Sequence, residues 1–168
     1  MRGQLLLALI LVVAACDPVT GTGPGTPPDP KQYLKTDMSS RAVIVTLIAG
    51  YPATDYQFNY DGYRNGALTL TVPAGWQVTV QCANHSTVPQ SCAVVANGSA
   101  TSPMQDGWST PNPEQGLAPG QSASFTFTPT ALGTFRIASL VRGSEASGMW
   151  MGLRVVGAGA PSLVGDAG

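Results

Sequence analysis

The chain has 168 residues, with 8 lysines and arginines, 9 aspartates and glutamates, and a net charge of −1. Charge this sparse and balanced argues against nucleic-acid binding, which needs clustered basic side chains to neutralise phosphates. With 20 glycines and 14 prolines, the composition favours short strands and tight turns over helices. We therefore expect an all-β protein with no nucleic-acid partner.

The first fifteen residues have the pattern of a signal peptide. Arg2 supplies a positive start, and residues 5–13 are all apolar, too short a run for the roughly 20 residues that cross a membrane as a helix. The run is followed by Ala-Ala-Cys16, which resembles the lipobox of bacterial lipoproteins. We therefore expect residues 1–15 to be removed and Cys16 to carry a diacylglyceryl lipid.

The expected lipid predicts the location of the protein, and the composition of the remaining chain predicts its domain boundaries. The protein would be exported and anchored through its lipid at the outer face of the cytoplasmic membrane, with an outer membrane as the alternative. Residues 16–35 are rich in proline and glycine and predict a flexible linker that buries no apolar surface. Residues 36–156 are long enough for one domain. Small residues dominate 157–168, which we expect to be a disordered tail.

Short apolar or alternating segments separated by turn residues predict seven or eight strands. The expected strands lie at residues 42–48, 56–60, 67–72, 76–82, 92–96, 121–128, 134–139 and 149–156. Between them, residues 97–119 predict a long loop, and loops of this length are usually functional or mobile. The pattern is typical of an antiparallel Greek-key β-sandwich.

Two cysteines, Cys82 and Cys92, remain once Cys16 is assigned to the lipid. An even pair in an exported domain favours a disulfide, with a metal thiolate or a redox pair as the alternatives. A bond closing so short a loop would stabilise the fold by about 2–3 kcal/mol in chain-entropy terms.

Three segments resemble sulfocyanins, which are blue-copper proteins of the cupredoxin fold. The first is Leu-Thr-Val-Pro-Ala-Gly-Trp-Gln-Val-Thr-Val at 70–80, preceded by Phe-Asn-Tyr-Asp-Gly at 58–62. The second is Ala-Pro-Gly-Gln-Ser-Ala-Ser-Phe-Thr-Phe at 118–127, and the third is Gly-Ser-Glu-Ala-Ser-Gly-Met-Trp at 143–150. The resemblance extends from about Val43 to Val156 and implies a cupredoxin-like sandwich.

In that family, copper lies between a mid-chain histidine and a loop that reads Cys, four residues, His, four residues, Met. A blue-copper site needs two imidazoles, one thiolate and a weak axial thioether. With the loop aligned on Met149, Ser144 stands at the histidine position and Ser139 at the cysteine position. Gln90, which follows a proline, stands at the mid-chain histidine position. Hydroxyls and an amide are poor copper ligands, so the resemblance implies that no metal and no copper cofactor is held here.

The lipobox and the resemblance together therefore imply a non-catalytic, membrane-anchored lipoprotein that has lost its type 1 copper site. Such a protein would act as a binding or structural module in the cell envelope, with a respiratory or envelope protein as its partner. The chain has one histidine, no recognisable pair of catalytic acids and no phosphate loop, which argues against an enzyme.

The alternative is a copper-binding electron-transfer or copper-handling protein with an altered site. A soft site could use His85 with Met104 and Met151 as ligands. A lone loop histidine is more often solvated, however, and methionines on a strand face are usually apolar packing groups. A third interpretation is an unrelated sandwich that matches the family by chance.

Overall fold

The computed structural model describes residues 25, 27–51, 56–96 and 98–166. Cys16 and the expected signal peptide therefore lie outside the described residues. Within the described ranges, the chain forms nine strands and one short 3-10 helix. None of the described helical structure is long and apolar enough to cross a membrane.

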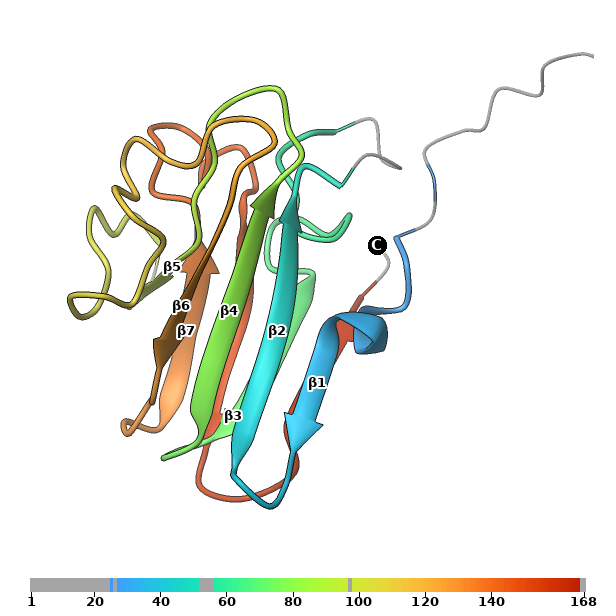
Figure 1. The fold of residues 1–168 in the computed structure, drawn as a ribbon, viewed down its shortest axis with the longest axis vertical. Coiled ribbons are helices and arrows are strands. Elements are labelled where there is room, and N and C mark those ends of the chain that lie inside the picture. Colours follow the sequence, from blue (N-terminus) through green and yellow to red (C-terminus); the bar gives the residue numbers. More distant parts are fainter. Residues whose placement is uncertain (1–24, 26, 52–55, 97, 167–168) are drawn as a thin grey trace, which may run out of the picture.

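The strands form two sheets that pack into a sandwich (Figure 1). The first sheet has the order β1-β2-β4-β6 and the second has the order β5-β7-β8-β3-β9. The elements are η1 (Pro30–Tyr33), β1 (Leu34–Asp37), β2 (Ala42–Ala49), β3 (Leu68–Pro73), β4 (Gln77–Asn84), β5 (Ala93–Val95), β6 (Ser122–Phe127), β7 (Gly133–Ala138), β8 (Trp150–Val156) and β9 (Ser162–Gly165). The expected all-β sandwich is confirmed.

Buried and solvent-facing side chains alternate along the strands, and the buried ones form a core between the two sheets. In β4, Val78, Val80 and Cys82 are buried, whereas Gln77 and Gln81 are exposed. Because successive side chains of a strand point to opposite faces, this pattern buries one face and leaves the other in solvent.

The sheets are mixed, so the prediction of an antiparallel sandwich is wrong at two strand pairs. β2 pairs with β4 in parallel, and β3 pairs with β8 in parallel. Each parallel pair joins strands that are not consecutive along the chain. Local alternation sets which face of a strand is buried, but it does not say which strand lies beside it or in which direction.

The disulfide between Cys82 and Cys92 is confirmed. Cys82 lies in β4 of the first sheet, and Cys92 directly precedes β5 of the second sheet. The two Cα atoms are 6.2 Å apart, and both residues are buried. The bond therefore joins the two sheets through the core, and it leaves neither cysteine available as a metal thiolate.

Three local predictions are corrected by the structure. The expected linker ends earlier than residue 35, because η1 and β1 begin at Pro30 and Leu34. The expected disordered tail contains β9, which pairs antiparallel with β3 and buries Leu163. At residues 56–60 no strand forms, and Tyr60 makes only isolated bridges.

Candidate functional site

The four positions that match the copper-ligand pattern meet at one end of the sandwich, and we call Gln90, Ser139, Ser144 and Met149 the candidate site. Gln90 lies between β4 and β5, Ser139 directly follows β7, and Ser144 and Met149 lie in the loop before β8. These loops gather at the upper end of the molecule in Figure 1. The exposed fractions of the four residues are 0% for Gln90, 1% for Ser139, 2% for Ser144 and 0% for Met149.

Backbone hydrogen bonds close the loop that carries three of these residues. The Ser139 N–H donates to the Met149 carbonyl at 3.0 Å, which extends the β7–β8 pairing one residue beyond Ala138 and Trp150. The Met149 N–H in turn donates to the Ser144 carbonyl at 3.0 Å. The spacing between the three positions is thus fixed by the ladder and the turn.

Ser91, the neighbour of Gln90, joins the first half of the candidate site to the second. Its N–H donates to Ser139 Oγ at 3.1 Å, and its own Oγ accepts from the Leu140 N–H at 2.9 Å. The two serine hydroxyl oxygens are 3.4 Å apart. The buried Tyr60 hydroxyl donates to the Ser91 carbonyl at 2.5 Å. The resemblance identified the four positions, but it assigned no role to Ser91 or Tyr60.

Gln90 is anchored by its backbone and unpaired at its side chain. Its N–H donates to the Leu117 carbonyl at 3.1 Å, and the Leu117 N–H donates back at 2.7 Å. Neither polar atom of its amide has a hydrogen-bond partner among the described residues. A buried amide left in this state costs about 1–3 kcal/mol per unpaired group, and such groups are rare in folded proteins.

The donor atoms of the candidate site do not fit copper. The site offers one amide, two hydroxyls and one thioether, whereas a blue-copper centre uses two imidazoles and a thiolate with a weak thioether. Only the Met149 sulfur belongs to that set. Elsewhere in the described ranges, no group of three or more histidine, cysteine, aspartate or glutamate side chains could hold a metal ion.

The alternative soft ligands lie in three different surroundings. His85 directly follows β4 and its side chain is exposed, while its backbone N–H donates to the Ala49 carbonyl. Met104 lines a small cleft beside Trp108, and Met151 is fully buried in the core.

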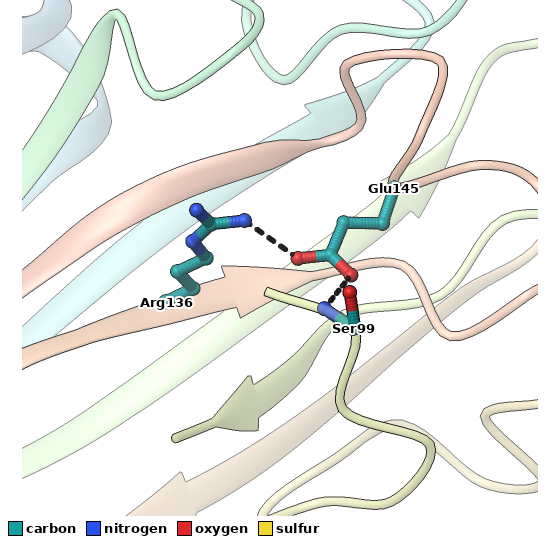
Figure 2. Close-up of polar contacts among 3 residues, drawn as sticks. All are labelled: Ser99, Arg136 and Glu145. Carbon is teal, nitrogen blue, oxygen red and sulfur yellow. Dashed lines mark hydrogen bonds and ion pairs between the residues drawn. The ribbon is translucent and has the colours of Figure 1, made fainter. Parts of the chain in front are cut away.

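An ion pair that no sequence motif predicts holds the loop between Ser139 and Met149 (Figure 2). Arg136 of β7 donates from Nη1 to Glu145 Oε1 at 2.8 Å, and Glu145 Oε2 accepts from the Ser99 N–H at 3.0 Å. The Arg136 guanidinium also lies 3.7 Å from the ring centroid of Trp150. Contacts of this kind contribute modestly at partly exposed positions, but together they tie the loop to β7 and to the long loop after β5.

An open groove lies beside the candidate site, with a volume of about 980 Å³. Ser139, Arg136, Glu145 and Trp150 line it, together with the exposed side chains of Arg142 and Glu114. Its volume falls at the upper end of the range of about 300–1,000 Å³ that is typical of ligand pockets. The lining is mixed in polarity and contains both signs of charge.

Comparison with known proteins gives a family match and several structural matches. A model of the sulfocyanin (SoxE) domain matches residues 29–162. Sulfocyanin from Sulfolobus acidocaldarius is 27% identical over 124 residues, which cover 67% of this chain and 62% of the relative. The chain therefore spans less than two thirds of that relative's length.

Solved structures of two copper proteins share the fold. Rusticyanin from Thiobacillus ferrooxidans superposes with a TM-score of 0.51 and 21% identity, covering 74% of this chain and 88% of that chain. Auracyanin A, a "blue" copper protein from Chloroflexus aurantiacus, superposes with a TM-score of 0.50 and 23% identity, covering 68% of this chain and 99% of that chain. At this identity the likeness concerns the fold alone, and it confirms the cupredoxin-like sandwich.

A buried carboxyl lies next to the tyrosine that supports the candidate site. Asp61 directly follows Tyr60 and is fully buried. Its Oδ1 accepts from the Ile48 N–H at 2.8 Å, while Oδ2 has no partner among the described residues. Burial raises the pKa of Asp61 from its ordinary 3.8 to about 7, although the hydrogen bond from Ile48 lowers it in part.

Because the pKa of Asp61 is raised, we predict that the stability of the fold decreases as the pH rises. Because the folded state binds the Asp61 proton more tightly than the unfolded chain, the stabilisation is complete below about pH 4 and is lost as the pH rises through about 7. The free energy of unfolding should fall by up to about 1.4 kcal/mol per pH unit across this window. In urea titrations between these pH values, Asp61→Asn should flatten the dependence, because the amide oxygen can still accept from Ile48.

The matched control is Asp106→Asn, at an exposed loop position. This variant should keep the pH dependence of the unmodified protein. If Asp61→Asn and the unmodified protein have the same slope, Asp61 is not the group responsible.

Proposed function

The chain belongs to the sulfocyanin (SoxE) domain family, and from this premise we propose that it is a non-catalytic member that has lost its type 1 copper site. In this proposal the protein is a lipoprotein held in the cell envelope through a lipid on Cys16. There it acts as a binding or structural module rather than as an electron carrier.

The observation that carries the proposal is the conflict between geometry and donor chemistry at the candidate site. All four residues are buried. Backbone hydrogen bonds connect Ser139, Met149 and Ser144, and Ser91, the neighbour of Gln90, bonds to Ser139 Oγ. Three of the four donors are nevertheless an amide and two hydroxyls. A serine hydroxyl does not ionise near neutral pH, and a single thioether is too weak to hold copper alone. Exchange of the ligands within a retained scaffold supports loss of the metal rather than loss of the fold.

The groove beside Ser139 supports the binding role. Its lining residues come mainly from the loop after β5 and the loop between β7 and β8, and loops held on a rigid sandwich are a common way to build a recognition surface. The Arg136–Glu145 pair fixes one wall. A respiratory or envelope protein at the same membrane is the partner we propose for this end of the molecule.

Copper titration of the full-length purified protein tests the loss of the site. We expect no intense blue absorption after Cu(II) is added, and no stoichiometric copper after desalting under oxidising or reducing conditions. The reason is that neither a thiolate nor a pair of imidazoles is present in the candidate site. His85→Ala is the matched control for weak binding at the single histidine.

Stoichiometric copper that survives desalting would contradict the proposal. If that copper were retained in the unmodified protein and lost in His85→Ala, the altered-site alternative would be supported instead. Blue colour in the unmodified protein would place a thiolate–copper bond where the structure offers none.

The lipid anchor is tested by Cys16→Ser. Expressed in a bacterial host that processes lipoproteins, the unmodified protein should fractionate with membranes and carry the mass of an attached lipid. Cys16→Ser should lose both properties, because two or more acyl chains are needed for durable anchoring and only the cysteine can accept them. Thr20→Ser, in the linker, should behave as the unmodified protein. Equal membrane association of the Cys16→Ser variant, with no lipid mass on either protein, would refute the anchor.

A further inference from the structure

The side-chain amide of Gln90 is the polar group of the candidate site that the described contacts leave unexplained. It is fully buried, and both its nitrogen and its oxygen lack partners among the described residues. An amide can donate two hydrogen bonds and accept two. A group with that capacity is rarely left dry inside a protein, and ordered water commonly supplies the missing partner.

The backbone of Gln90 is fixed in place by its neighbours. Its backbone N–H and carbonyl both bond to Leu117. Gly116 packs so closely that an added Cβ would lie 3.0 Å from Gln90 N and 2.6 Å from Val141 Cγ2. The backbone is therefore held on both sides, and the side chain that it carries is fully buried.

The side chains of the candidate site favour a neutral polar ligand, such as water, over a cation. Ser91, the next residue along the chain from Gln90, bonds to Ser139 Oγ, and backbone hydrogen bonds join Ser139 to Met149 and Met149 to Ser144. None of these side chains carries a charge, whereas cations bound in proteins are mostly held by carboxylates and several other oxygens. A buried water typically makes about three hydrogen bonds, and the unpaired amide of Gln90 offers both a donor and an acceptor.

We propose that Gln90 binds an ordered internal water molecule in the candidate site, so that a polar hydration site has replaced the metal. This goes beyond loss of copper, because it states which hydrogen-bond partner the buried Gln90 amide has in place of the metal.

A crystal structure of the full-length protein, at a resolution that resolves single waters, tests this directly. The expected result is one water at about 2.7–3.2 Å from a Gln90 amide atom and from at least one further protein group. A Gln90 amide paired directly with protein atoms, or one with no neighbouring density, overturns the proposal. Anomalous scattering measured at the copper edge separates the two claims: a copper peak at this position would overturn the proposed function as well, whereas a dry amide would overturn only the hydration site.

A stability comparison provides a second readout. Gln90→Met keeps the length of the side chain but removes its hydrogen bonds to the water. If the water is present, the Tm should fall by about 4 °C, as expected for one lost hydrogen bond in a domain of this size. If the amide is dry and unpaired, methionine removes a penalty, so an unchanged or raised Tm overturns the proposal. Gln115→Met, at an exposed loop position, is the control for the same exchange and should leave the Tm unchanged.

Discussion

The hydrogen bonds between Ser91 and the Ser139–Leu140 segment are the contacts on which the candidate site depends. They join the loop after β4 to the end of β7, which are separated by 48 residues along the chain. They continue the pairing of β5 with β7, which ends at Ala93 and Ala138, into the loops that carry Gln90 and the other three residues. Both serines are buried, so breaking these bonds would leave polar groups without a hydrogen-bond partner and away from water. That cost stabilises the contact between the two loops.

Further contacts within the chain hold the rest of this end of the molecule together. The Cys82–Cys92 disulfide fixes the chain two residues after Gln90, and the Arg136–Glu145 ion pair holds the loop that carries Ser144. Tyr60 supports Ser91 from inside the sandwich. A scaffold closed by protein contacts alone can tolerate exchange of its copper ligands, which is the physical reason why we propose a binding module built on an electron carrier's fold.

Much of the fold could be predicted from the sequence because the relevant signals are local. Alternation in β4 and β6 showed which faces are buried, and the even cysteine pair indicated the disulfide. Parallel pairing of β2 with β4, and the strand β9 in the supposed tail, depend on partners distant in sequence and were missed. The candidate site came from resemblance to a family rather than from periodicity. Its supports, Ser91 and the Arg136–Glu145 pair, are contacts across the fold that no motif encodes.

The central claim is that the copper geometry persists while its ligands have been replaced. The most direct measurement is the absorption spectrum of the triple variant Gln90→His, Ser139→Cys and Ser144→His after addition of Cu(II). We predict an intense blue band from a copper–thiolate bond with two imidazoles and Met149, the ligand set of a type 1 site. If the triple variant folds and its spectrum stays colourless, the four positions do not share that geometry and the account is contradicted.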